Sequence, residues 1–366
     1  MRLGVLAIPL LQATYKSDFL GLYIGGLMVR EGNGAHLYDT GAILAREQQI
    51  LSDLNGIRMY LRSPFYALAL SPLTILPLWP AFVLEMSVFY AALLACWAWA
   101  ARRFGPDSLI WSALYYPAAI GTAYGQDCVV VLVALILSYR SLEKGRLFRA
   151  GLLLGIALIK FHLIILFPLV LLMHRKWRVL AGLTISTCIA LGLSFAVIGV
   201  KGIPAYIRIL QDNSQDTSIN SPQSMLNIYS IPANFDIESR AINAALALLI
   251  VGLTVTAAYR APLWRWFSAA AVGSLLIVPH CYLYDGTFLL LPLWLVMFQS
   301  EMKSTRVAAL ILAMPFLYFF LISHPPYTVI PMLPVLIFLI ALAWEGYRSM
   351  NARTGSGNVQ LQYAAH

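Results

Sequence analysis

Long apolar runs separated by short charged segments dominate the sequence and predict about twelve membrane-spanning segments. We place them at residues 3–15, 81–101, 108–120, 128–138, 150–159, 163–173, 179–198, 241–259, 267–278, 286–298, 307–322 and 329–344. Several are shorter than the roughly 20 residues that a straight helix needs to cross a bilayer. We therefore expect broken or tilted helices, which membranes tolerate where the chain lines a cavity.

The composition supports this interpretation. Hydrophobic residues make up 60% of the chain, charged residues 11%, and the mean hydropathy is +0.76. Soluble domains carry about 25% charged residues, because water must wet their surface. This excludes a soluble enzyme, a disordered chain and a disulfide-stapled secreted module. We predict an all-α polytopic membrane protein with a single transmembrane domain over residues 1–350 and a flexible cytoplasmic tail over 351–366.

The distribution of charge gives the expected orientation. The chain holds 25 Lys and Arg against 16 Asp and Glu, and most of the basic residues fall in alternate loops. With the N-terminus inside, the cytoplasmic loops contain Arg102, Arg103, Arg140, Lys144, Arg146, Arg149, Arg175, Lys176, Arg178, Arg260, Arg265, Lys303 and Arg306. This obeys the positive-inside rule. We expect a multi-pass protein of a bacterial inner membrane with both termini cytoplasmic.

The first apolar run has two interpretations. Arg2 and the apolar residues after it also fit the start of a signal peptide with a cleavage site near Ala13. Leu11 fits the −3 position of such a cleavage site poorly, and removal of the segment would upset the charge distribution. We favour an uncleaved anchor.

Two loops on the opposite side are long. The first, residues 16–80, contains an amphipathic stretch (19–30), a glycine-rich turn (32–34) and a second helical stretch (40–54). It ends in an apolar piece reaching Leu78, which we predict to be a juxtamembrane helix lying in the interface. The second loop, residues 201–240, is polar and rich in Asn, Ser, Asp and Pro.

Polar residues at the ends of spans are the candidates for function. The predicted topology places several of them on the extracytoplasmic face: Asp18, Gln126, Asp127, Lys160, His162, His280 and Asp285. Ionisable groups at a membrane interface are costly, so each is a functional candidate. Lys160 lies in a short turn between two apolar runs, where a phosphate could serve as its anion; the alternative is a lysine that snorkels to the interface.

The other candidates also have structural alternatives. Asp18 could cap the helix that follows it, Gln126 and Asp127 could cap the next span, and His280 could be a structural histidine. Tyr38 and Asp39 follow the glycine-rich turn and could shape that loop, with Asp39 as a helix cap.

Several chemistries find no support in the sequence. The four cysteines show neither CxxC pairing nor zinc spacing, and there is no phosphate-binding P-loop, GxGxxG or HExxH motif. Basic residues do not line one helix face as in nucleic-acid-binding proteins. We expect no cofactor, no metal and no nucleic-acid partner.

The order of short motifs resembles a known family. Ser17-Asp18-Phe19, Gly32 and Leu37-Tyr38-Asp39 are similar to the opening signature of glycosyltransferase family 87, the polyprenyl-phosphate-mannose-dependent mannosyltransferases. Ser63-Pro64-Phe65 resembles the family's Pro-Pro-Phe segment, with Ser63 in place of the first Pro, and Gly125-Gln126 and the stretch ending at Lys160 continue the match.

This resemblance implies a GT-C-type bundle of about twelve transmembrane helices with a large first extracytoplasmic loop that carries juxtamembrane helices. It implies transfer of a hexose from a polyprenyl-phosphate donor to a lipid or glycan acceptor, and the family name indicates mannose as the sugar. The enzyme would also contact the membrane lipids around it. Asp18 matches the acidic residue expected to be the catalytic base, and a single base implies inversion. We expect Lys160, His280 and His162 to bind the donor phosphate. Tyr38, Asp39, Gln126, Asp127 and Asp285 are expected to line the substrate loop.

Two other functions fit a multi-span chain. A lipid or saccharide transporter or flippase without transferase activity would show inverted repeats and mid-membrane ionisable groups, and no repeat is detectable here. A polymerase or ligase of lipid-linked saccharides tends to need arginine-rich outer loops, whereas here acidic residues slightly outnumber basic ones in these loops.

Overall fold

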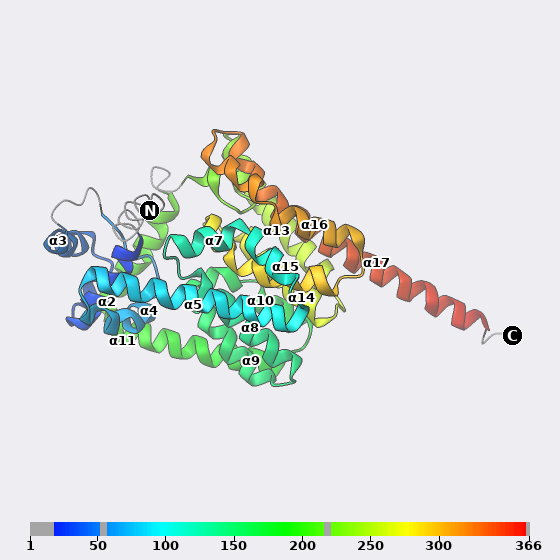
Figure 1. Ribbon diagram of the computed structural model, residues 1–366, viewed down its shortest axis with the longest axis horizontal. Coiled ribbons are helices and arrows are strands. Elements are labelled where there is room, and N and C mark those ends of the chain that lie inside the picture. The colour runs from blue at the N-terminus through cyan, green and yellow to red at the C-terminus, as the bar shows by residue number, and fades with distance from the viewer. Residues whose placement is uncertain (1–17, 52–56, 216–220, 364–366) are drawn as a thin grey trace.

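The computed structural model describes residues 18–51, 57–215 and 221–363, so the predicted first span at residues 3–15 lies outside the described residues. The described part of the chain folds into helices joined by short turns and contains no strand (Figure 1). This confirms the all-α class.

Five short helices of the first loop gather at one end of the molecule (Figure 1). They are α2 (Asp18–Arg30), η1 (Gly34–His36), α3 (Thr40–Ile50), α4 (Pro64–Leu70) and η2 (Ser71–Ile75). In α2 every residue from Phe19 to Met28 is buried, so this helix lacks the exposed polar face expected of the amphipathic stretch predicted over residues 19–30. The predicted juxtamembrane helix is divided in two, α4 and η2, and Ile75 at its end is largely exposed.

The central part of the bundle is formed by longer elements. They are α5 (Leu78–Phe104), α6 (Ser108–Leu114), α7 (Tyr116–Ala123), α8 (Cys128–Glu143), α9 (Leu147–Leu154), η3 (Gly155–Ile164), α10 (Phe167–Met173) and α11 (Trp177–Gln215). Arg103 at the end of α5 pairs with Glu143 at the end of α8, with 3.0 Å between Nη2 and Oε1. This pair marks the end of the bundle opposite to the start of α8.

The C-terminal part completes the bundle. Its elements are η4 (Pro222–Ser224), α12 (Ser230–Asn234), α13 (Arg240–Ala258), α14 (Leu263–Ile277), η5 (Leu283–Leu289), α15 (Leu290–Gln299), α16 (Lys303–Ala313), η6 (Pro315–Ile322), η7 (Tyr327–Met332) and α17 (Leu333–Tyr363). Almost all of α14 and the whole run from Asp285 to Val296 are buried, so these segments form the centre of the core.

Among the described residues, five helices are long and apolar enough to cross a membrane, or six if one bent pair counts as a single span. They are Leu78–Phe104, Leu147–Ile164, Trp177–Leu210, Arg240–Ala258 and Tyr327–Asn351, with the bent pair Lys303–Ala313 and Pro315–Ile322. The count of about twelve is therefore not confirmed. Other predicted spans correspond to shorter pieces; residues 108–120, for example, form the two short helices α6 and α7.

The expected helix breaks are present. The backbone of Lys160 leaves helical geometry inside η3, with φ −128° and ψ 61°. Gly199 interrupts α11 with φ 59°, a conformation that glycine adopts readily because it lacks a Cβ atom. The Lys160 break turns that side chain into the bundle, where it contributes to the site described below.

Two boundaries differ from the sequence prediction. Helix α11 continues past Lys201 to Gln215, where a polar loop was expected from residue 201; the apolar residues Ile203, Ile207 and Leu210 recur at helical spacing within this continuation. Helix α17 continues to Tyr363 and projects from the bundle, whereas the last span was expected to end at residue 344 (Figure 1). The flexibility expected of residues 351–366 stays a prediction. A helical backbone satisfies its own hydrogen bonds and needs no packing partner to do so.

Helices α9 and α11 pack backbone to backbone through glycines. A Cβ atom at Gly182 in α11 would lie 2.9 Å from the amide nitrogen of Leu152, and closer still to the carbonyl oxygen of Phe148. A Cβ atom at Gly151 in α9 would lie 2.7 Å from the amide nitrogen of Leu183. Small residues let membrane helices approach closely in this way.

We expect Gly182→Ala to destabilise the protein by about 1–3 kcal/mol, because the added methyl group meets backbone atoms that cannot move independently. The matched control is Gly192→Ala in the same helix, where a Cβ atom would meet no atom within 4 Å. That change should be neutral or stabilise by up to about 1 kcal/mol, since alanine favours helix over glycine. Thermal unfolding in detergent measures both, and equal midpoints for the two variants would contradict the close packing.

Candidate active site

A cluster of buried charges lies at the end of the bundle that carries α2, α3 and α4. At its centre, Nζ of Lys160 lies 2.6 Å from Oδ1 of Asp285 and 3.2 Å from Oδ1 of Asp127. The same ammonium group donates to Sγ of Cys128 at 3.0 Å. Lys160 is 2% exposed, and both carboxylates are buried as well. The lysine thus joins two acidic residues that are far apart in the sequence.

Three chain segments bring these groups together. Asp127 directly precedes α8, Lys160 stands at the break in η3, and Asp285 lies in the first turn of η5. The second oxygen of Asp285 accepts a hydrogen bond from the amide of Tyr282 at 2.8 Å, which fixes that carboxylate. Lys160 thus contacts both Asp127 and Asp285, residues that the sequence analysis placed with it on one face.

Arg62 is the second cation of the cluster, and the sequence analysis did not find it. Its Nε and Nη2 atoms lie 2.8 and 3.2 Å from the two oxygens of Asp127, a bidentate ion pair. Burial alone would raise the pKa of the Asp127 carboxyl, but Arg62 and Lys160 hold this pKa below its usual range. Asp127 is therefore a carboxylate whose charge is neutralised by two neighbours. It does not act as the simple helix cap considered as an alternative.

Asp18 lies at the edge of this cluster, at the first residue of α2. Its Oδ2 atom accepts a hydrogen bond from Nε2 of Gln126, and Oε1 of Gln126 accepts one from Nη2 of Arg62 at 3.3 Å. Unlike Asp127 and Asp285, Asp18 is exposed. Of these three carboxylates, Asp18 alone is both accessible and outside the ion pairs with Lys160 and Arg62.

The two predicted histidines flank the cluster. His162 interacts electrostatically with Asp285, and the ring of His280 packs at 4.8 Å on that of Tyr282. Burial lowers the pKa of His280, which favours its neutral form. The ammonium of Lys160 also lies 5.1 Å from the centroid of the Tyr284 ring, a cation–π contact.

The hydrogen bonds that Tyr38 and Asp39 make are with backbone groups and not with the charged side chains of the cluster. The Tyr38 hydroxyl donates to the backbone oxygen of Arg62 at 2.6 Å, so this side chain supports the segment that carries the arginine. Oδ1 of Asp39 accepts hydrogen bonds from the amides of Gly41 and Ala42 and caps α3. Asp39 thus takes the capping role that the sequence left open.

The contacts of Lys160 bear on its expected role as a phosphate ligand. An ammonium group has three protons to donate, and here three acceptors surround it: two carboxylates and a thiol. A donor phosphate would have to displace one of them to contact Lys160. Arg62, whose side chain is 18% exposed, is more accessible to a ligand.

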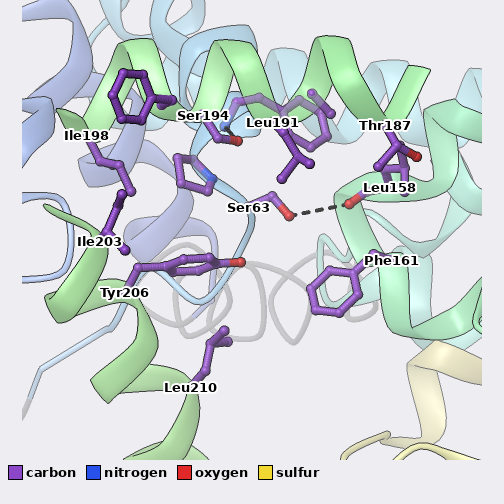
Figure 2. A pocket seen from close by; sticks show the side chains of 14 residues that line it. Ser63, Leu158, Phe161, Thr187, Leu191, Ser194, Ile198, Ile203, Tyr206 and Leu210 are labelled. Atoms are coloured by element: carbon purple, nitrogen blue, oxygen red, sulfur yellow. Dashed lines mark hydrogen bonds between the residues drawn. The ribbon is translucent and has the colours of Figure 1, made fainter. Parts of the chain in front are cut away.

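An apolar cavity of about 660 Å³ is lined in part by residues that directly follow cluster residues in the sequence. Ser63 and Phe161, the residues that follow Arg62 and Lys160, line it from one side, and α11 forms the opposite wall (Figure 2). Figure 2 shows Leu191 and Tyr206 on the two parts of α11 that border this space. The Ser63 hydroxyl donates to the backbone oxygen of Leu158 at 3.3 Å, and the Phe65 amide donates to Ser194 Oγ at 3.2 Å. These two polar groups beside the cavity thus have hydrogen-bond partners within the protein.

Comparison with known proteins gives one family. The model of glycosyltransferase family 87 matches residues 60–292, which include Arg62, Gln126, Asp127, Lys160, His162, His280 and Asp285. Asp18, Tyr38 and Asp39 precede the matched region. No curated protein and no solved structure matches the chain.

Proposed function

Because the chain belongs to glycosyltransferase family 87, we propose that it transfers a hexose, mannose, from a polyprenyl-phosphate donor to a lipid or glycan acceptor. We place this reaction at the extracytoplasmic face of a bacterial inner membrane, with both chain termini in the cytoplasm. Family membership makes the protein a glycosyltransferase, so the alternative of a flippase without transferase activity is not favoured. The observation that carries the mechanism is the exposure of Asp18 beside two buried, ion-paired carboxylates.

The proposed reaction is a single displacement. Asp18 takes the proton of an acceptor hydroxyl while the hydroxyl oxygen forms a bond to the anomeric carbon of the sugar. The bond between that carbon and the phosphate oxygen breaks, and its electron pair leaves on the polyprenyl phosphate. Asp127 and Asp285 are neutralised and buried, and therefore poorly suited to act as a nucleophile. One active carboxylate is typical of inversion at the anomeric carbon.

The leaving phosphate needs positive or hydrogen-bonding groups fixed in place. Arg62 suits this role, since Asp127 holds its Nε and Nη2 atoms and the side chain stays partly accessible. His162 and His280 flank the same region and can donate hydrogen bonds to phosphate oxygens. Lys160 contributes to this role mainly by fixing Asp127 and Asp285, because its protons face those carboxylates and Cys128.

The apolar cavity supports a lipid-linked donor. Its lining consists of side chains such as Phe65, Phe161, Leu191 and Leu210, which suit an isoprenoid chain and not a nucleotide. Since Ser63 and Phe161 immediately follow the two cations of the cluster, a donor with its chain in the cavity can direct its phosphate towards Arg62.

The test of this proposal is a comparison of donors with the purified protein in lipid vesicles. We expect sugar transfer from polyprenyl-phosphate mannose and none from a nucleotide-linked mannose. Nuclear magnetic resonance of the product should show the anomeric configuration opposite to that of the donor. Transfer from the nucleotide-linked sugar alone, or retention of configuration, would contradict the proposal.

The cavity yields a separate prediction. Ala190→Trp in α11 places a large ring in the space proposed for the isoprenoid chain. We expect KM for the polyprenyl-phosphate donor to rise about 10-fold or more with little change in kcat, because binding of the non-reacting chain is lost. The matched control is Ala181→Trp, an exposed position of the same helix that does not line the cavity. Equal KM values for the two variants would place the lipid elsewhere.

A further inference from the structure

The side chain of Gln126 connects Asp18 to the buried ion pairs. Its oxygen accepts from Nη2 of Arg62 at 3.3 Å, and its nitrogen donates to Oδ2 of Asp18. Gln126 is 2% exposed, so water offers it few other partners. The amide is therefore the direct link between the accessible carboxylate and the interior of the cluster.

Arg62 determines the direction in which this amide points. A carboxamide has an accepting and a donating end of nearly the same shape, but a guanidinium group can only donate. The oxygen of Gln126 must therefore face Arg62, which leaves the NH₂ group directed at Asp18. Arg62 is in turn held by both oxygens of Asp127. The orientation of the amide thus depends on a buried ion pair.

The turn that contains Gln126 is held by its own backbone. The amide of Gly125 donates to Thr122 O at 3.0 Å, and that of Gln126 donates to Gly121 O at 2.9 Å. Gly125 has φ +65°, a conformation that favours glycine. Since the turn is stabilised by these contacts, the Gln126 side chain is not needed to form it, and its two polar contacts require another explanation.

We propose that Gln126 is a positioning residue that acts through Asp18. It holds Oδ2 of Asp18 so that Oδ1 is directed at the acceptor hydroxyl, and its orientation is set by the Arg62–Asp127 pair. This inference rests on the proposed function of Asp18 as the base. It differs from the sequence expectation, in which Gln126 lines a substrate loop.

The sharpest test is Gln126→Glu, which keeps the shape of the side chain. The new carboxylate can still accept from Arg62, but it replaces the NH₂ group facing Asp18 with an oxygen. Two adjacent carboxylates share a proton, so the base is protonated up to a higher pH. We expect the rising limb of the pH–kcat profile to move up by about one pH unit or more, with KM for the donor unchanged. The matched control is Gln48→Glu on the exposed face of α3, which should leave the profile as it is.

A second variant separates positioning from charge. Gln126→Leu removes both hydrogen bonds without adding a charge, and kcat should fall by roughly 10- to 100-fold through loss of orientation. A profile of Gln126→Glu that overlays that of the wild type, or a Gln126→Leu variant with full kcat, would overturn the proposal.

A measurement without activity distinguishes this failure from failure of the proposed function. In a double-mutant cycle of Asp18→Ala and Gln126→Leu, each of which removes the contact between the two side chains, we expect the shifts in the free energy of unfolding to be non-additive. Additive shifts would show that the two side chains do not interact, which would refute the positioning role. Absence of transfer by the wild-type protein from any lipid-linked sugar would instead refute the proposed function.

Discussion

Replacing Asp18 by asparagine should lower kcat by about 10²- to 10⁴-fold, the range typical of removing a general base. Asparagine keeps the size of the side chain and can still accept the hydrogen bond from Gln126, but it cannot take a proton at neutral pH. KM for the donor should change little, since the base is proposed to contact the acceptor hydroxyl. The rate is measured with polyprenyl-phosphate mannose and the purified protein.

Two controls make this result specific. The free energy of unfolding of Asp18→Asn should lie within about 0.5 kcal/mol of the wild-type value, because Asp18 is exposed and outside the buried ion pairs. Asp107→Asn, an exposed aspartate before α6 and remote in sequence from the cluster, should keep full activity. If Asp18→Asn retains wild-type kcat, the assignment of the base is wrong.

Replacing Lys160 by methionine should destabilise the protein by about 3–5 kcal/mol, the usual cost of removing one partner from a buried ion pair. Methionine fills similar space but leaves the buried Asp285 carboxylate without the ammonium group, with hydrogen bonds from two neutral donors, the amide of Tyr282 and the thiol of Cys128. Asp127 keeps its bidentate contact with Arg62, so most of the effect should come from Asp285. Thermal or denaturant unfolding in detergent measures the change.

The double variant Lys160→Met/Asp285→Asn identifies the cause. Neutralising Asp285 removes the unpaired charge, so the double variant should be more stable than Lys160→Met alone. Lys144→Met, at an exposed position, should change stability by less than about 0.5 kcal/mol. A Lys160→Met protein as stable as the Lys144→Met control would mean that the ammonium is not held as the contacts of Lys160 indicate.

The convergence of polar groups could be predicted because successive antiparallel helices return to the same end of a bundle. Gln126, Asp127, Lys160 and Asp285 all stand where apolar runs end. In the structure Lys160 contacts Asp127 and Asp285, and Gln126 contacts Arg62. Hydrophobic periodicity locates such positions even when the exact helix ends are wrong. The helices themselves were harder to count, because breaks such as those at Lys160 and Gly199 divide apolar runs into pieces shorter than a span.

Arg62 could not be predicted from the same pattern. It lies in an irregular segment between α3 and α4, where no periodicity marks the direction of a side chain. Its partner Asp127 is 65 residues away in the sequence, and the two residues meet only in the folded chain. The two carboxylates that contact Lys160 could not be predicted for the same reason, and the expected role of this lysine as a phosphate ligand stays a prediction.

The most direct test of the account is transfer of radiolabelled mannose from polyprenyl-phosphate mannose in vesicles that contain either the wild-type protein or Asp18→Asn at equal amounts. We expect labelled acceptor and released polyprenyl phosphate with the wild type, and neither above background with the variant. Release and transfer at equal rates by both proteins would contradict Asp18 as the base. No transfer by the wild type from this or any other polyprenyl-phosphate sugar would contradict the central claim.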